Sequence, residues 1–510
     1  MNIKDLVIAF LVALGFALTF QYFFGKRTEE TEVISRSRIA PRLEEINRPL
    51  NFEVDFIDKD LNVAEELTDV ATPFAHYQFS SKGAVLTKAE FIHDVGRKNL
   101  LISTVEAAES ANRCFLLALE QKTPLAYKLT EKTEDEHATQ LTYQASIDDG
   151  TIIKRFVVAK NVCKIDLHVE LQRSTQNELR FRLFYPSPRV PSMHDDIVHG
   201  LVNEKAGILK RTIDIVKEGR YWEIPTLFGA EDRYFVHVMT NDPQHFAQRG
   251  YFKLDGQAQL LCALETGALR TPASWTMTFY MGPKQLSLMQ AVDPRLNATL
   301  EYGWTEPLSK PLLYVLNVLY SYVKNYGLAI ILLTLLIKLI LLPFSLRGQM
   351  RMQESAKKQK DLQQKLQYLK QKYKDDRETF NREQAELIRK HGMPGFGGCL
   401  VLFLQLPIFI ALQRILYGAV ELYQAPFLWI PNLASSDPYY ILPIFVGIGM
   451  AFSTGMAKQG DMRQRMMSYG MALIFAAVTV QFAAGLSLYI AVSTLLTVLQ
   501  NYLQTKIQKA

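Results

Sequence analysis

The chain has 510 residues, with 57 Lys and Arg against 51 Asp and Glu, and a mean hydropathy of +0.00. Averages of this kind are typical of a soluble protein of two to four domains. The distribution of residues excludes that class, because long apolar runs are concentrated near the two ends and globular sequence lies between them. We therefore predict a polytopic α-helical membrane protein with six spans, a large extracytoplasmic β-sandwich domain and a cytoplasmic helical hairpin.

Residues 1–25 are predicted to form an N-terminal signal-anchor span. The segment is almost wholly apolar from Leu6 to Phe24. A cleaved signal peptide is the alternative. The apolar run is long for a signal peptide, however, and no small-x-small cleavage pattern follows it. Residues 26–49 are polar and mixed in charge, which indicates a linker.

Residues 50–306 are predicted to form the β-sandwich outside the cytoplasm. Apolar and polar residues alternate along Lys164–Leu171 and Leu179–Leu183. This alternation is typical of strands that bury one face of an antiparallel sheet. The cysteines of the segment do not form an even disulfide framework, so that one bridge and buried free thiols are both open. They are Cys114, Cys163 and Cys262.

Residues 307–325 are predicted to form an amphipathic helix in the membrane interface. Asn317, Ser321 and Lys324 share a polar stripe at helical spacing, and apolar residues fill most other positions. The alternative is that this segment begins the next span. Residues 326–510 follow as a five-span core. Its expected spans are Gly327–Leu346, Cys399–Tyr417, Tyr439–Met456, Met467–Phe482 and Gly485–Lys506.

The short loops between these spans predict the orientation of the chain. Arg347–Lys390 holds 13 Lys and Arg against 7 Asp and Glu, whereas Glu421–Asp437 holds no Lys or Arg. Because basic loops stay in the cytoplasm, both termini and the basic segment are expected there. Residues 347–392 should form a helical hairpin that contacts anionic lipid, or else a ribosome or an incoming chain. Its candidate contact residues are Arg351, Lys357, Lys358 and Lys372.

Lys338 lies near the middle of an apolar span, about 13 Å along the helix from the expected boundary at Arg347. None of the five C-terminal spans contains an Asp or Glu to pair with it. A lysine at this depth is costly without a partner or water, so we predict a hydrophilic groove. Each polar residue available for its lining is, taken alone, more typical of a helix–helix hydrogen bond. These residues are Thr334, Gln405, Gln413, Ser453, Thr454, Thr479, Gln481, Ser487, Tyr489 and Ser493.

Motifs for covalent chemistry are weak. No Walker or G-x-G-x-x-G motif occurs, and His194–Asp196 with His199 lacks the spacing of zinc proteases and fits a surface loop better. The lack of acidic residues within the spans also argues against a proton or cation transporter. We therefore expect no enzymatic activity, no metal and no cofactor.

Several stretches of the C-terminal 200 residues resemble the YidC/Oxa/Alb family of membrane protein insertases, in its Gram-negative form. The order of the predicted elements is similar to that family as well. The stretches are Pro394–Cys399, Gln405–Phe409, Glu421–Phe427, Asp437–Pro443 and Gly485–Tyr489. The resemblance implies a multi-pass protein of the bacterial inner membrane with its large domain in the periplasm. The implied partners are nascent membrane proteins, the Sec translocon, the ribosome and the phospholipid bilayer, without a specific nucleic acid.

The resemblance also implies roles for individual residues. Lys338 matches a positively charged position in a groove that opens to cytoplasm and lipid, where bacterial members commonly carry arginine. The Ala483–Ala484 turn departs from the proline-bearing turn usual before the last span. Thr334 and Tyr489 match groove or substrate-contact positions of the family, and Gln405 and Ser487 join them from the polar residues of the spans, so the predicted groove residues are Lys338, Thr334, Gln405, Ser487 and Tyr489. The function expected on this basis is insertion and folding of inner-membrane proteins through the groove, alone or with the Sec translocon. A transporter or channel that uses the same cavity is the alternative.

Overall fold

The computed structural model describes residues 64–94, 99–106, 114–119, 125–148, 150–173, 179–188, 198–204, 207–212, 221–254, 260–300, 302–373, 376–391, 399–456 and 462–507. The predicted anchor and linker, the His194–Asp196 motif and residues 394–398 lie outside these ranges, as do the side chains of Arg351, Lys357 and Lys358. The described residues divide into two compact units, a β unit within Thr28–Glu301 and a helical unit that begins at Tyr302.

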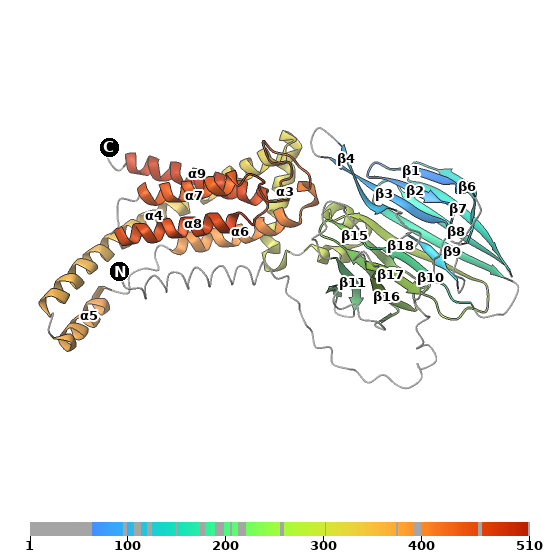
Figure 1. The fold of residues 1–510 in the computed structure, drawn as a ribbon, viewed down its shortest axis with the longest axis horizontal. Coiled ribbons are helices and arrows are strands. Elements are labelled where there is room, and N and C mark those ends of the chain that lie inside the picture. The colour runs from blue at the N-terminus through green and yellow to red at the C-terminus, as the bar shows by residue number, and fades with distance from the viewer. Residues whose placement is uncertain are drawn as a thin grey trace. The chain divides into compact units, whose positions relative to one another are not determined.

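The β unit contains three sheets in which all neighbouring strands are antiparallel (Figure 1). The four-stranded sheet has the order β1 (Leu67–Ala71), β2 (Ala75–Ser80), β3 (Val85–Asp94), β4 (Asn99–Glu106). The five-stranded sheet has the order β13 (Trp222–Glu223), β16 (Arg249–Leu254), β17 (Leu260–Glu265), β10 (Arg182–Pro186), β5 (Leu116–Ala118). The nine-stranded sheet has the order β12 (Gly207–Thr212), β11 (His199–Glu204), β14 (Phe228–Glu231), β15 (Phe235–Asn241), β18 (Ala273–Pro283), β9 (Lys164–Arg173), β8 (Gly150–Ala159), β7 (Ala138–Ile147), β6 (Lys128–Glu134).

Both smaller sheets pack on one face of the nine-stranded sheet. Phe79 of β2 lies 4.9 Å from Phe156 of β8, and Tyr185 of β10 lies 5.3 Å from Phe279 of β18, measured between ring centroids. Phe115 contacts both Phe156 and Phe279, at 5.7 and 4.8 Å. The alternation predicted for Lys164–Leu171 is confirmed, because alternate residues of β9 are buried beneath these sheets. The architecture is therefore a layered β-sandwich.

His237 of β15 joins all three sheets through its two ring nitrogens. Its Nδ1 lies 3.0 Å from the carbonyl oxygen of Pro186 in β10, and its Nε2 lies 3.1 Å from Thr104 Oγ1 in β4. A carbonyl oxygen only accepts, so Nδ1 carries the proton and Nε2 accepts from the threonine hydroxyl. The neutral ring is therefore fully hydrogen-bonded in the core.

Acid should weaken the β unit through His237. Burial lowers the pKa of His237 from 6.5 to about 4. Between these values the unfolded chain binds more protons than the folded chain. The free energy of unfolding should therefore fall by about 3 kcal/mol as the pH drops through this window, with the full contribution present above pH 6.5. Thermal unfolding of His237→Gln, followed by circular dichroism from pH 4 to 7, should show a flatter pH dependence. An unchanged pH dependence would contradict this assignment.

The cysteines of the β unit are free thiols in the core. Cys114, Cys163 and Cys262 are buried, and none of them forms a disulfide. Burial raises the pKa of the Cys163 thiol to about 12 and holds that of the Cys114 thiol well above its usual value. Of the two alternatives left open by the sequence, the structure has free thiols, and burial makes them inert in the folded state.

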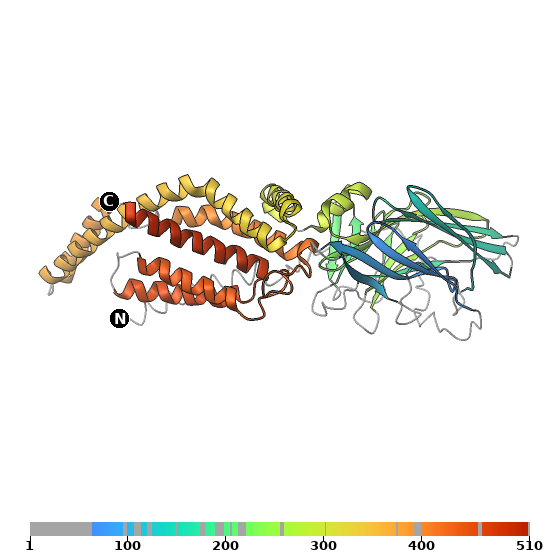
Figure 2. The same cartoon turned by 90° about the horizontal axis from the view of Figure 1, so that it is seen from above.

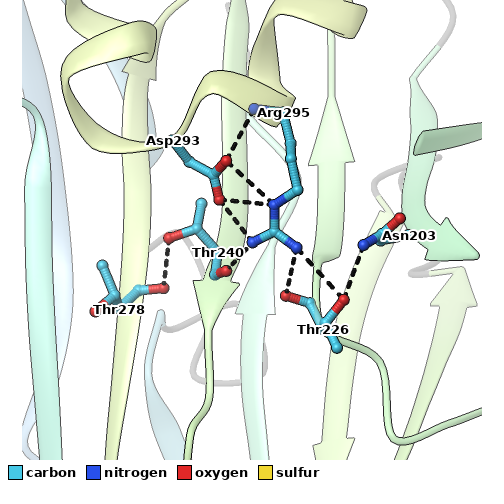
Figure 3. Close-up of polar contacts among 6 residues, drawn as sticks. All are labelled: Asn203, Thr226, Thr240, Thr278, Asp293 and Arg295. Atoms are coloured by element: carbon cyan, nitrogen blue, oxygen red, sulfur yellow. Dashed lines mark hydrogen bonds and ion pairs between the residues drawn. The ribbon is translucent and has the colours of Figure 1, made fainter. Parts of the chain in front are cut away.

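A short helical segment closes the β unit after its last strand. It consists of α2 (Leu286–Val292) and the 3-10 helix η4 (Pro294–Thr299). Figure 3 shows how Arg295 fixes this segment to the sheets. Its guanidinium pairs with Asp293 at 2.6 Å and donates to the backbone carbonyl oxygens of Thr240 and Thr226. Thr226 Oγ1 in turn accepts from Asn203 Nδ2 at 2.8 Å. Arg295 therefore links η4 directly to Thr226 and Thr240, and through Thr226 to Asn203.

The helical unit contains a bundle with one helix that is much longer than the rest (Figure 2). Its elements are η5 (Gly303–Thr305), α3 (Glu306–Val323), α4 (Tyr326–Lys372), α5 (Arg377–His391), α6 (Cys399–Gly418), η7 (Val420–Leu422), α7 (Ile441–Met456), α8 (Met462–Thr479) and α9 (Ala484–Ile507). Within the described residues, α4 and α9 hold the two helices long and apolar enough to cross a membrane, Tyr326–Arg347 and Ala484–Gln504. Two shorter apolar helices are Ile441–Ser453 and Tyr469–Thr479.

The outward face of helix α3 includes part of its predicted polar stripe and aromatic residues as well. Tyr320 stacks on Tyr326 of α4, with ring centroids 3.8 Å apart. This contact sets the rotation of α3, so that Tyr314 and Tyr322 are 71% and 82% exposed. Ser321 and Lys324 of the predicted polar stripe are exposed, and Asn317 is partly exposed. The outward face of α3 is therefore aromatic as well as polar, which is typical of a membrane interface.

Candidate functional site

Helix α9 carries its polar residues on the side that faces the other helices. These residues recur at helical spacing and are Tyr489, Ser493, Thr497 and Gln500. The opposite side is apolar and exposed, and contains Leu495, Leu499 and Leu503. A soluble helix has the reverse arrangement. The sequence of α9 therefore brings polar groups into the bundle, and we call these four residues the α9 polar face.

Lys338 of α4 contacts this polar face. Its Nζ donates to Thr497 Oγ1 at 3.0 Å, and the side chain is partly buried. Seven residues further along α4, Ser345 Oγ accepts from Gln500 Nε2 at 3.0 Å. At the start of α9, Gly485 packs against Ile330 of α4. The three contacts occur in the same order along both helices, so α4 and α9 run parallel, as Figure 2 also shows.

Thr334 is near Lys338 on α4 but is not its hydrogen-bond partner. The Thr334 side chain is buried, and its Oγ1 donates to the carbonyl oxygen of Ile330 in its own helix at 2.7 Å. Threonine commonly satisfies its hydroxyl in this way inside helices. The structure therefore places Thr334 in the packing between helices, one turn before the lysine.

Gln405, Ser487 and Tyr489 lie nearer the first half of α9. Gln405 Nε2 of α6 donates to the Tyr489 hydroxyl, and Ser487 Oγ donates to the carbonyl oxygen of Thr479 in α8 at 3.3 Å. Tyr489 and Ser487 are buried, whereas Gln405 is partly exposed. Through these contacts α9 is hydrogen-bonded to α6 and α8 as well as to α4.

Several residues of this network were not among the groove-lining residues predicted from the sequence. Thr497, Gln500 and Asn501 of α9 belong to it, and Asn501 Nδ2 donates to Ser453 Oγ of α7 at 3.0 Å. Ser345 of α4 was also missed. The three α9 residues share a positional signal, since they continue the polar spacing of Tyr489 and Ser493 toward the end of the helix, whereas Ser345 lies seven residues after Lys338 on α4.

Lys372 of the predicted hairpin lies far from Lys338. Lys372 is the last residue of α4, and 34 helical residues separate it from Lys338 by about 51 Å. Its Nζ lies 5.1 Å from the ring centroid of Tyr373. Helix α4 is continuous from the apolar span into this segment, and α5 packs back against its end. Two separate candidate surfaces thus occur on one helix.

The described residues offer no site for a metal ion. They contain no group of three or more His, Cys, Asp or Glu side chains placed to hold one. His199 lies in β11, where it pairs in register with Glu231 of β14.

Comparison with known proteins identifies the family. Residues 68–315 match the family described as the YidC periplasmic domain, and residues 318–510 match the 60Kd inner membrane protein family. A membrane protein insertase YidC from Geotalea uraniireducens is 30% identical over 463 residues, 85% of each chain. The corresponding protein of Anaeromyxobacter dehalogenans is 32% identical over 73% of this chain and 70% of its own.

Other matches are partial or distant. The match to the Geobacter metallireducens relative is 34% identical and spans 58% of this chain and 56% of that protein. A crystal structure of an active YidC insertase with its first transmembrane domain resolved covers 88% of this chain and 95% of its own, at 19% identity and a TM-score of 0.38. On the two matched families and the long alignments to the Geotalea and Anaeromyxobacter proteins, the chain belongs to the YidC family of membrane protein insertases.

Proposed function

We propose that this chain inserts membrane proteins into the bacterial inner membrane and helps them fold, by means of a hydrophilic groove at Lys338. The observation that carries the proposal is the contact between Lys338 and Thr497, in a region where residues 326–346 of α4 and 484–499 of α9 expose apolar side chains. No carboxylate occurs in the described parts of α6, α7, α8 and α9 or in residues 326–347. A lysine in that setting is stabilised by polar groups and water, and it attracts acidic segments.

The surface of the helical unit supports its immersion in lipid. Helix α7 exposes an apolar stripe in which each side chain is at least 57% exposed, namely Ile444, Phe445, Ile448 and Phe452. Exposed apolar residues outside and hydrogen-bonded polar residues inside are typical of helices solvated by a bilayer. The shorter apolar helices can still cross the membrane where the bilayer is locally thinned.

The parallel direction of α4 and α9 supports the proposed topology. Two parallel spans are separated by an odd number of crossings, and α6, α7 and α8 supply three. Together with an anchor at residues 1–25, this gives six spans. The β-sandwich then lies in the periplasm, while both termini and the hairpin at 347–392 lie in the cytoplasm, in agreement with the basic loops.

In the proposed mechanism a hydrophilic substrate tail enters the groove toward Lys338, which shortens its path through hydrocarbon. The apolar segment then leaves sideways along α6 and α8. Helix α6 is buried mainly near its outer end, at Leu412, Ile415 and Leu416, whereas Leu406 is exposed. Burial of the substrate segment in lipid, at about 25 cal/mol per Å², drives the reaction. The protein lowers the barrier and needs neither a nucleotide nor covalent chemistry.

The proposed partners follow from this mechanism. Nascent membrane proteins and the bilayer are essential to it. The Sec translocon and the ribosome are further proposed partners, with Arg351, Lys357, Lys358 and Lys372 as the contact residues of the hairpin. Cysteines introduced at these four positions should cross-link to ribosomes. If no cross-link forms while the ribosomes are translating, the proposed ribosome contact is wrong.

The function is tested with purified full-length protein in liposomes. A small single-span protein should integrate faster in the presence of the chain than in empty liposomes. The same vesicles should conduct neither ions nor small solutes, which separates an insertase from a channel or transporter. Failure to accelerate integration would contradict the proposed function.

Water access to the groove can be measured by thiol labelling, in a Cys399→Ser background. We expect Lys338→Cys and Thr497→Cys to react with a charged maleimide added from the cytoplasmic side. Leu339→Cys and Leu495→Cys lie on the exposed apolar faces of the same helices and should resist it. Equal labelling of all four positions would show that no hydrophilic groove is present.

A further inference from the structure

We propose that Thr497 is the positioning residue that holds the Lys338 ammonium at the α9 side of the groove, where it receives acidic substrate segments. The inference rests on the proposed function and adds a positioning residue to it. It starts from the single hydrogen bond that connects the two side chains, 3.0 Å between Lys338 Nζ and Thr497 Oγ1.

The Thr497 hydroxyl is oriented to act only as an acceptor toward the lysine. Thr497 Oγ1 donates its own proton to the carbonyl oxygen of Ser493 at 2.8 Å. Its lone pairs are then directed away from the α9 backbone, and one of them accepts from Lys338. Because the hydroxyl proton is held by the Ser493 carbonyl oxygen, the hydroxyl cannot rotate to point this proton at the ammonium. The position of the lysine is therefore coupled to the α9 backbone.

A second contact fixes the two helices on which this hydrogen bond depends. Ser345 and Gln500 join α4 and α9 at 3.0 Å, on the cytoplasmic side of the Lys338 contact in the proposed topology. A lysine side chain is a flexible chain of four carbons and can adopt many rotamers of similar energy. With the helix positions fixed by a separate pair, Thr497 selects among those rotamers.

A second buried lysine shows what a purely structural lysine looks like in this chain. Lys154 in the β unit donates to three carbonyl oxygens, those of Gly83, Ala84 and Phe115, at 3.0, 2.5 and 2.7 Å. Its ammonium has no donor left. Lys338 by contrast has Thr497 as its hydrogen-bond partner among the described residues, which leaves two N–H directions for another acceptor. A substrate carboxylate is the acceptor that matches a positive charge with two free donors.

The test compares two substrates in liposomes with the full-length chain. Both are the same small single-span protein, with Asp and Glu in the translocated tail of one replaced by Asn and Gln in the other. We expect Thr497→Val, which keeps the shape but loses the hydroxyl, to slow insertion of the acidic substrate about tenfold. The neutral substrate should change less than about twofold. Thr497→Ser restores the hydroxyl and should restore the rate for the acidic substrate.

Thr494→Val is the matched control. Thr494 lies on α9 three residues before Thr497, but its Cγ2 packs against Gly449 of α7. Valine keeps that methyl group, so neither substrate should be affected. Thr497→Ala provides a second truncation, should the valine variant fold poorly, and is expected to show the same difference between substrates.

The possible outcomes are distinct. Equal loss with both substrates would show that Thr497 only packs, and no loss with either would show that it does not position Lys338. Faster insertion of the acidic substrate would mean that Thr497 restrains the lysine instead, which also overturns the inference. If the wild-type chain inserts neither substrate, the proposed function fails, and with it the inference that rests on it.

Discussion

Lys338→Glu is expected to slow insertion of single-span substrates with acidic tails on the order of 100-fold. The substitution reverses the charge at the one lysine of the apolar part of α4, in a partly buried position next to Thr497. Like charges brought together at low dielectric cost several kcal/mol. Lys338→Arg keeps the charge and should stay within about threefold of the wild type, since a guanidinium can also donate to the Thr497 hydroxyl.

Initial rates of integration measure the effect, with protease protection of the translocated tail as the readout. Lys324→Glu is the control for charge reversal, because Lys324 is exposed at the end of α3 and should leave insertion unchanged. A substrate without charges in its tail should lose far less with Lys338→Glu. Normal insertion of the acidic substrate by this variant would show that the wetness of the groove matters and its charge does not.

The sequence reveals Lys338 because the relevant signal is local. One lysine in an apolar run, with no acidic residue in the other spans, can be recognised without knowing how the helices pack. The strand alternation of β9 is local in the same sense, and it predicts correctly which of its residues face the smaller sheets. Short-range periodicity therefore gives the class of each segment and the side on which its polar residues lie.

Contacts between distant segments were not predictable in this way. Helical spacing puts Thr334 on the same side of α4 as Lys338, but the partner of Lys338 is Thr497, 159 residues further along the chain. Thr334 satisfies its hydroxyl within its own helix, and no periodicity reveals that choice. His237 joins three sheets because of how these sheets stack, which a strand pattern does not encode. The roles of Lys338, Thr334 and Tyr489 toward a substrate stay predictions.

The alternation of residues in β8 indicates that Lys154 is buried. In β8 it alternates with Ile152 and Phe156, so a lysine occupies a position on the core face of the strand. It is fully buried, and its Nζ lies 5.3 Å from the centroid of the Phe156 ring. Burial lowers the pKa of Lys154 from 10.5 to about 7, while the Cys114 thiol nearby opposes this shift. Its three carbonyl partners compensate in part for the loss of water.

Replacing Lys154 with Met should destabilise the β unit by about 3–5 kcal/mol, because the carbonyl oxygens of Gly83, Ala84 and Phe115 lose a common donor and stay buried. Alkylation of the three buried thiols during a urea series, in the Cys399→Ser background, reports unfolding of this unit alone. Lys160→Met is the control, since its partner Glu134 is exposed to solvent and loss of this ion pair should destabilise the unit far less.

The pH dependence of this difference identifies Lys154 as its cause. From about pH 7 to 10.5 the unfolded chain keeps the lysine proton that the folded chain has begun to release, so the unfolded state binds more protons. The contribution of Lys154 to the free energy of unfolding should therefore rise with pH in this window and be constant below it. The stability of the wild type relative to Lys154→Met should increase between pH 7 and 9, after normalising alkylation to the unfolded chain at each pH. Equal stability of the two chains at every pH would mean that the three carbonyl oxygens find other donors.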